Sequence, residues 1–146
     1  MEKLEDSVAV VRARNESGCF SDSNALKISL CLVSGIQYLH EAGYHHRDLH
    51  EGNFLFSFVL LQMGVSVKIT DFGLAVDLKN IPTKELLPVN TKCLFASSAL
   101  NYGLEINKKD EYESILYALL IMAGGLGPIS ESENMKKTEE KLDHWF

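Results

Sequence analysis

The chain has 146 residues and a formal net charge of −6, with 46% hydrophobic and 23% charged residues. This length and composition are typical of one soluble globular domain with a sizeable core. The acidic balance argues against a nucleic-acid or anionic-membrane surface, and the apolar runs are too short or too interrupted to span a bilayer.

The cysteines and the first residues of the chain indicate the cellular compartment. The chain has three cysteines, Cys19, Cys31 and Cys93. Their odd number and the lack of metal-binding spacing between them favour reduced thiols. The opening residues, MEKLEDS, do not have the pattern of a signal peptide. The sequence therefore predicts a cytoplasmic or nuclear protein.

The first predicted element is a helix that follows a polar and mixed segment, residues 1–20. Ser21 is a suitable N-cap, apolar residues then recur with broad helical spacing, and Gly43 suits the position just past a helix end. Cys31 falls within this pattern and is expected to pack in the core. We therefore predict a helix that stops at Gly43.

Two β-prone pieces come next, at 54–56 and 66–69, and two motifs flank them. The run from His46 to Asn53, HRDLHEGN, precedes the first piece, and Asp71-Phe72-Gly73 follows the second. The predicted loop between the two pieces carries an unusually apolar run, 58–61. The two motifs therefore sit on loops at the ends of a small β element.

Phosphoryl transfer explains the residue types in these motifs. The acceptor hydroxyl needs a carboxylate that aligns it and takes its proton, a role that suits Asp48. Mg²⁺ prefers oxygen ligands beside phosphate and water, and Asn53 and Asp71 offer an amide oxygen and a carboxylate. Gly73 is expected to let the backbone turn sharply after Asp71. The residue types in the two motifs are therefore those that transfer of a phosphoryl group from a nucleotide would need.

The second predicted helix runs from about Asp110 to Ala123 and ends at Gly124-Gly125. It is apolar nearly all round, which is typical of a helix inside a domain. The stretch before it, 77–107, is predicted to be irregular, and the tail, 130–146, to be a charged surface helix. The predicted fold is mainly α with one small β element that holds two loops.

The pair of motifs resembles the protein-kinase signature H-R-D-x-x-x-x-N plus D-F-G, and further segments resemble the casein kinase I group with its tau-tubulin kinase relatives. These segments are Asn53-Phe54-Leu55, similar to that group's N-F signature; Phe95-Ala96-Ser97 and Lys108–Ser114, similar to its YAS and RRDDLES blocks; and Gly125–Pro128, similar to its G-x-L-P-W. The resemblance covers nearly the whole chain. It implies a protein-kinase-like C-terminal lobe, ATP and Mg²⁺ as cofactors, and acidic or pre-phosphorylated Ser/Thr protein substrates.

By position, the resemblance also implies roles for single residues. Leu55 would lie under the adenine, and Asp110 would cap the strained catalytic loop from the buried helix. His46 would pack and hold that loop, so it is not expected to act as a chemical acid or base. Lys108 and Lys109 would either lie near an anion-binding surface or form a solvated basic pair.

Four features depart from the kinase pattern. No residues resemble the Gly-rich phosphate loop, the strand lysine or its glutamate partner, so the chain is expected to lack the N-terminal lobe that positions ATP. His50 stands where Ser/Thr kinases usually carry lysine, and it is mostly neutral at pH 7. Thr91-Lys92 replaces the expected Gly-Thr, and the run 58–61 is unusually apolar. These departures predict a truncated kinase domain that is weakly active or inactive.

Other functions stay open. A pseudokinase-like module would bind protein partners instead of transferring phosphate. A small-molecule phosphotransferase of the aminoglycoside or choline kinase type shares the pattern D-L-H-x-G-N of Asp48–Asn53, although Asp71–Ala75 and the block 95–117 speak against it. A zinc site that includes His45 and His50 is not favoured, because no cysteine is nearby and both are expected to be loop residues.

Overall fold

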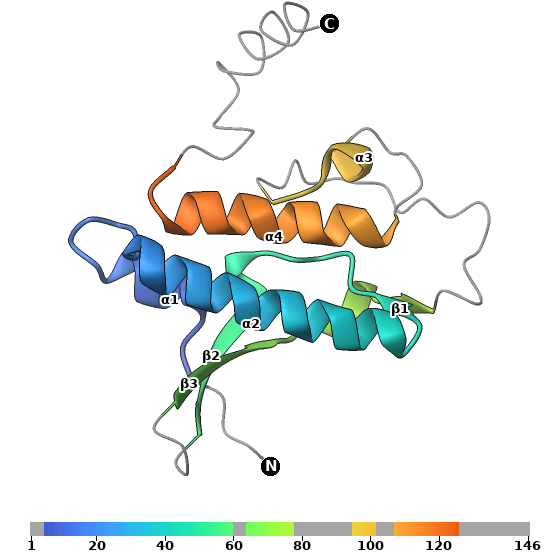
Figure 1. The fold of residues 1–146 in the computed structure, drawn as a ribbon, viewed down its shortest axis with the longest axis horizontal. Helices are drawn as coiled ribbons and strands as arrows, with labels where there is room; N and C mark the ends of the chain where they lie inside the picture. Colours follow the sequence, from blue (N-terminus) through green and yellow to red (C-terminus); the bar gives the residue numbers. More distant parts are fainter. Residues whose placement is uncertain (1–4, 60–63, 78–94, 102–106, 126–146) are drawn as a thin grey trace, which may run out of the picture.

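The computed structural model describes residues 5–59, 64–77, 95–101 and 107–125. Its longest elements are helix α2 (Asp22–Glu41), helix α4 (Lys108–Met122) and an antiparallel hairpin of strands β2 (Phe54–Val59) and β3 (Gly64–Ile69). Helix α2 lies between α4 and the hairpin, and buried side chains of all three fill the core (Figure 1). The predicted fold, mainly α with a small β element, is confirmed for these residues.

Helix α2 follows the predicted bounds. Ser21 occupies the N-cap position with extended dihedral angles, although its side chain makes no capping hydrogen bond. Ala42 is the C-cap, and Gly43 has a φ of +93°, in the left-handed region that favours glycine past a helix end. Cys31 packs at the edge of the core, as predicted. The core face of the helix carries Ala25, Ile28, Leu32 and Ile36.

The segment before α2, which the sequence shows only as polar and mixed, contains the short helix α1 (Val8–Ala13). Val8 is fully buried in the core. Just before the helix, the backbone of Glu5 and Asp6 forms hydrogen bonds with the backbone of Phe56, so this segment runs along the edge of β2. A helix this short is marginal by itself, and tertiary contacts stabilise it.

The β2–β3 hairpin is longer than the sequence predicts. Its register runs from Phe54 opposite Ile69 to Val59 opposite Gly64, so the start of the predicted apolar loop belongs to β2. The rest of that loop, 60–63, lies outside the described residues, as do most of 77–107 and the whole predicted tail helix. The remaining described elements are β1 (Tyr44–His45), which pairs with β4 (Val76–Asp77), helix α3 (Ser98–Asn101) and the 3-10 helices η1 (Glu51–Asn53) and η2 (Phe72–Leu74).

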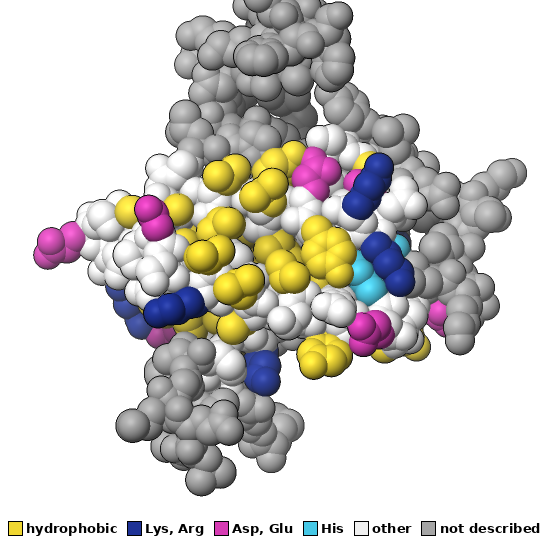
Figure 2. Space-filling view, viewed as in Figure 1, with side chains coloured by type: hydrophobic (Ala, Val, Ile, Leu, Met, Phe, Trp, Pro, Cys, Tyr) yellow, Lys and Arg dark blue, Asp and Glu magenta, His cyan; other side chains and the backbone are white. Residues whose placement is uncertain are grey.

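The residues that the structure describes cover helix α4 on one of its sides and leave the other side exposed. Ile115, Ala118 and Met122 are buried, whereas Leu116 and Leu120 are 50% and 43% exposed. They continue an apolar surface that spreads over α2 and α4 in Figure 2. This α2–α4 face includes the exposed side chains of Leu26, Leu30, Tyr38, Leu116 and Leu120. Among the described residues α2 covers only the other side of α4, so the prediction that α4 lies inside the domain is confirmed for that side alone.

Neither α4 nor any other helix in the described ranges is long and apolar enough to cross a membrane.

Candidate active site

The loop between β1 and β2 brings two of the predicted site residues into direct contact. The side-chain amide of Asn53 donates to the backbone oxygen of Asp48 at 2.9 Å and to its carboxylate at 3.1 Å. Asn53 is buried and Asp48 is half-buried. Both donations use the amide nitrogen, so the amide oxygen is the Asn53 side-chain atom that can bind a cation. The contact therefore orients the Asp48 carboxylate and a hard oxygen ligand together.

The start of this loop is strained and is held by a buried histidine. Arg47 has a φ of +71°, a conformation that costs a non-glycine residue about 1–3 kcal/mol. The fully buried ring of His46 accepts a hydrogen bond from the backbone N–H of Asp48 at 3.3 Å and bonds the backbone oxygen of Thr70 at 3.0 Å. The packing role predicted for His46 is confirmed.

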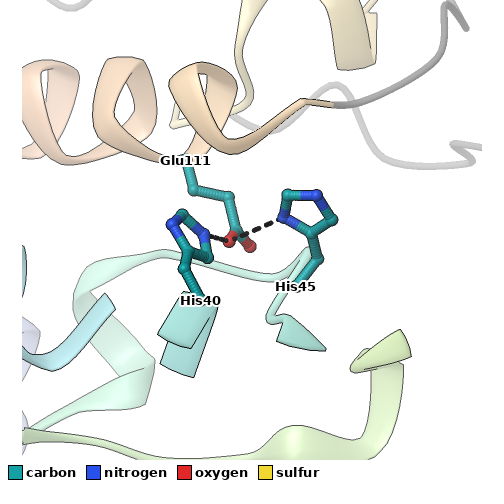
Figure 3. A group of neighbouring side chains, drawn as sticks. All are labelled: His40, His45 and Glu111. Carbon is teal, nitrogen blue, oxygen red and sulfur yellow. Dashed lines mark hydrogen bonds and ion pairs between the residues drawn. The ribbon is translucent and has the colours of Figure 1, made fainter. Parts of the chain in front are cut away.

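A buried carboxylate, Glu111 of α4, anchors the same strained turn. One of its oxygens accepts hydrogen bonds from the backbone N–H groups of His46 and Arg47 at 2.6 and 2.7 Å. The other lies 2.5 Å from Nε2 of His40 and 3.1 Å from Nδ1 of His45 (Figure 3). Four contacts thus converge on one carboxylate that is 3% exposed. A buried anion with this many partners is stable in the interior and holds the loop in place.

This anchor corrects a prediction from the sequence, which assigned the loop cap to Asp110. Asp110 instead accepts a hydrogen bond from the backbone of Asn107 at 2.6 Å and completes the capping box of its own helix. Adjacent helical residues point about 100° apart, so only one of the two acids can face the loop. The sequence shows two acids side by side at the helix start, and nothing in it selects Glu111.

The clustered histidines are also placed differently from the prediction. His45 is a buried residue of β1 and bonds Glu111, so it is not a loop residue. The ligand atoms of His40, His45 and Glu111 lie within 4.8 Å of one another. Their hydrogen bonds account for this proximity, because Glu111 is the common acceptor of both rings and of the loop backbone. The cluster is therefore best explained as the support of the loop.

The environment of Glu111 shifts its acidity. Burial alone would raise the pKa of Glu111, but the hydrogen bonds from His45, the Arg47 backbone and His40 outweigh it, and the pKa lies below its ordinary value of 4.5. The carboxylate therefore stays ionised over a wider acidic range than an exposed glutamate would.

The lowered pKa of Glu111 predicts acid-sensitive stability. A carboxylate whose pKa is lower in the folded chain stabilises the fold above its unfolded pKa, near 4.5, and loses this contribution as the pH falls through the folded pKa. We expect the free energy of unfolding to fall as the pH drops below about 4.5, and to fall less in Glu111→Gln. Urea titrations followed by circular dichroism across this window measure both proteins. Equal pH dependence in the two would contradict this assignment.

The second motif places Asp71 on a strained turn of its own. Asp71 has a φ of 62°, and its carboxylate accepts a hydrogen bond from the backbone N–H of Gly73 at 3.2 Å. The sharp turn therefore occurs at Asp71, whereas the sequence assigned it to Gly73, whose φ is not positive. Glycine is still favoured there, because a Cβ on Gly73 would lie 3.1 Å from the Asp71 carboxylate. The Asp71 side chain itself is exposed.

The hairpin register brings the two motifs to the same end of β2 and β3. Phe54 pairs with Ile69, and the next residue, Thr70, donates both its backbone N–H and its hydroxyl to the backbone oxygen of Asn53, at 2.9 and 3.0 Å. Asp71 follows Thr70 directly. The oxygen ligands offered by Asn53 and Asp71 thus emerge from neighbouring strand ends, and both are of the hard type that Mg²⁺ prefers.

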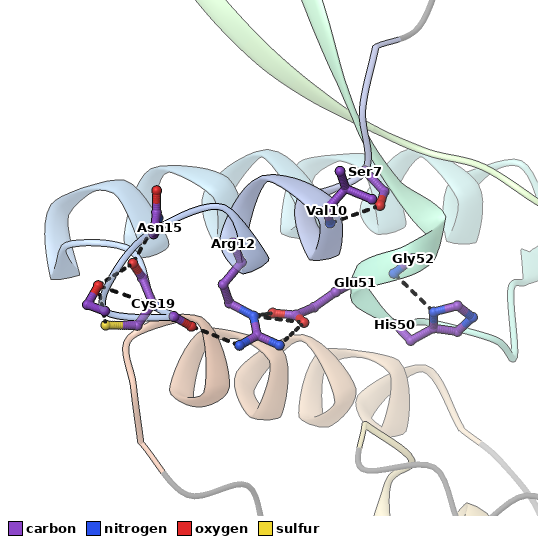
Figure 4. A network of polar contacts seen from close by, with 10 residues as sticks. Ser7, Val10, Arg12, Asn15, Cys19, His50, Glu51 and Gly52 are labelled. Carbon is purple, nitrogen blue, oxygen red and sulfur yellow. Dashed lines mark hydrogen bonds and ion pairs between the residues drawn. The ribbon is translucent and has the colours of Figure 1, made fainter.

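A bidentate ion pair, which the sequence does not predict, holds the far end of the loop that carries Asp48 and Asn53. Arg12 of α1 donates to both carboxylate oxygens of Glu51 at 2.8 to 3.0 Å, and to the backbone oxygen of Gly18 at 2.9 Å (Figure 4). Glu51 is 3% exposed and belongs to η1, beside Asn53. Paired, planar contacts of this kind fix geometry well. The partners are 39 residues apart, so no local pattern links them.

Two further predicted positions complete the site. His50 caps η1 by accepting a hydrogen bond from the backbone of Gly52 at 3.1 Å, and its Nε2 lies 3.6 Å from the Asp48 carboxylate. Leu55 is half-buried on β2, opposite Lys68. Thr91-Lys92, which the sequence marks as a departure, lies outside the described residues.

Comparison with known proteins shows which family this chain matches. The protein kinase domain family matches residues 1–143 of the chain. A probable serine/threonine-protein kinase of Dictyostelium discoideum is 27% identical over 133 residues, which cover 88% of this chain and 27% of that protein. The chain therefore spans about a quarter of the length of this curated relative.

Proposed function

The chain belongs to the protein kinase family, and from this premise we propose that it is part of an ATP-dependent kinase that phosphorylates serine or threonine in proteins. The contact between Asp48 and Asn53 carries the proposal, because it orients the proposed general base and a proposed metal ligand as one pair. The hairpin register adds Asp71 at the same strand end. We propose that these three groups, which have complementary chemistry, form one site.

The residues divide the work of phosphoryl transfer in this proposal. Asp48 orients the acceptor hydroxyl and takes its proton as the new oxygen–phosphorus bond forms and the bond to the ADP leaving group breaks. The amide oxygen of Asn53 and the carboxylate of Asp71 would hold Mg²⁺ on the nucleotide phosphates. When bound, the metal neutralises charge on those phosphates. Glu111 and Arg12 support the reaction indirectly, because they hold the loop that orients Asp48.

The finer assignment is to the casein kinase I group, with Leu55 under the adenine. It is supported by Asn53-Phe54-Leu55, by the segment 95–97 and by the block 108–114. We also propose that the chain corresponds to the C-terminal lobe of a kinase domain, and that the chain by itself is weakly active or inactive. His50 supports the proposal of weak activity, because it stands near Asp48 where Ser/Thr kinases usually carry lysine, and an imidazole ring is a weaker phosphate ligand than an ammonium group.

A protein-binding role is the alternative that a structural feature favours. Among the described residues, the α2–α4 face presents five exposed apolar side chains, which lie together on one face instead of being scattered over the surface (Figure 2). Contiguous apolar surface of this kind marks contact sites for other chains or segments. A pseudokinase-like module would use such a surface without transferring phosphate.

Calorimetric titration of the purified chain with a non-hydrolysable ATP analogue tests the proposed site. We expect Mg²⁺ to raise the affinity about tenfold or more, and Asp71→Ala to remove that increase because it deletes a metal ligand. Asp22→Ala, an exposed acid at the start of α2, is the matched control and should behave as the parent chain. A folded chain that binds the analogue equally with and without Mg²⁺ would rule out the proposed metal site and favour the protein-binding role.

A further inference from the structure

A cavity away from the candidate active site lies between the first half of α2 and the β2–β3 hairpin. Its volume is about 240 Å³. The walls are largely apolar and include Phe20, Ile28, Phe56 and Val67. Phe56 and Val67 face each other across the hairpin, so both strands contribute to one wall. Burying an apolar group against such walls removes apolar surface from water and favours binding.

Polar groups enter this cavity from one element only. Lys27 and Asn24, both exposed residues of α2, line it beside the apolar walls. Lys27 takes part in none of the ion pairs found among the described residues. A cation at the rim of an apolar cavity complements a ligand that has an apolar body and one anionic end.

The volume of the cavity limits the size of the ligand that it can hold. The cavity is slightly smaller than the ~300 Å³ at which drug-sized sites begin, and it equals roughly eight water molecules at about 30 Å³ each. A single ring or a short alkyl chain fills such a space. We infer that this cavity is a binding site for a small apolar carboxylate, with its body against Phe56 and Val67 and its carboxylate paired with Lys27.

The site is independent of the proposed phosphoryl transfer. None of the lining residues is Asp48, Asn53 or Asp71. Cys31 lines the cavity and is a partly buried free thiol, so it reports on occupancy without being required for binding. Binding can therefore be measured whether or not the chain binds nucleotide.

The first test compares three probes that share one body. 4-Phenylbutyrate, the neutral 4-phenylbutanol and the cationic 4-phenylbutylamine are titrated into the chain and followed by NMR. We expect the carboxylate to bind with a Kd on the order of 1 mM, with shifts centred on Phe56 and Val67. The alcohol should bind less tightly and the amine least. Equal binding of carboxylate and amine, or shifts elsewhere, would overturn the inference.

A pair of lysine variants tests the role of charge. Lys27→Gln should weaken binding of 4-phenylbutyrate about two- to fivefold, the range expected for an exposed ion pair, and should leave the alcohol unchanged. Lys68→Gln is the matched control, because Lys68 follows Val67 on β3 and therefore points to the opposite face of the hairpin. Both positions are exposed, so both variants should fold. Equal losses in the two variants would refute a specific carboxylate contact.

Protection of the thiol gives an independent readout. In a chain with Cys19→Ser and Cys93→Ser, alkylation of Cys31 by N-ethylmaleimide should slow about sixfold when 4-phenylbutyrate is present at about five times its Kd. The same treatment should leave Cys19 unprotected in a chain that keeps it and carries Cys31→Ser. An unchanged rate at Cys31 would show that the probe does not occupy the cavity.

Discussion

Replacing Glu111 with alanine is expected to lower the free energy of unfolding by about 3–5 kcal/mol, a large share of the stability of a small domain. The substitution leaves the backbone N–H groups of His46 and Arg47 without their buried acceptor. It also removes the partner of His40 and His45. A buried donor without a partner has lost its hydrogen bonds to water and gains none in the protein, so its desolvation free energy is not offset. The expected loss of stability is therefore larger than that of one ordinary hydrogen bond.

Urea unfolding at pH 7 measures this effect, and Asp110→Ala is its matched control. Asp110 lies next to Glu111, and among the described residues its carboxylate bonds the start of its own helix, so its loss should cost about 1 kcal/mol. If Glu111→Ala does not fold, Glu111→Gln replaces it, because glutamine keeps one acceptor oxygen for the loop. An equal or larger loss for Asp110→Ala would contradict the assignment of Glu111 as the anchor.

Replacing Asp48 with asparagine is expected to slow whatever phosphoryl transfer the chain carries out by about 10² to 10⁴, the usual contribution of a positioned general base. Asparagine keeps the shape of the side chain and an oxygen that can accept the hydrogen bond from Asn53. It cannot take a proton from the acceptor hydroxyl. Nucleotide affinity should therefore stay close to that of the parent chain, because Asp48 is not one of the proposed metal ligands.

The measurement is the initial rate of phosphate transfer from Mg-ATP to casein, together with calorimetric nucleotide affinity. Asp22→Asn, at an exposed position in the first turn of α2, serves as the control for the loss of one acid. A parent chain with no transfer would show that it is not a kinase by itself. Transfer by Asp48→Asn at the parent rate would contradict the role of Asp48, and transfer to small hydroxyl compounds instead of casein would favour the small-molecule phosphotransferase.

Local patterns determined the two long helices and the two motifs. The helical spacing after Ser21 predicted α2, because that helix is long enough for its period to be visible. The long apolar run from Asp110 to the glycines at its end predicted α4. The motifs are contiguous, so the chemistry of Asp48, Asn53 and Asp71 could be stated before any contact was known. The mainly helical fold follows from the same local signals.

Tertiary structure decided what supports those motifs. Asp110 and Glu111 are equivalent acids in sequence, and only the rotation of α4 against the loop selects Glu111. Arg12 and Glu51 meet across 39 residues, and their pairing fixes a short helix that has no periodicity of its own. The turn at Asp71, with its positive φ, depends on the hairpin that holds it. The sequence by itself therefore determined which groups could react, while packing between distant segments decided how they are held.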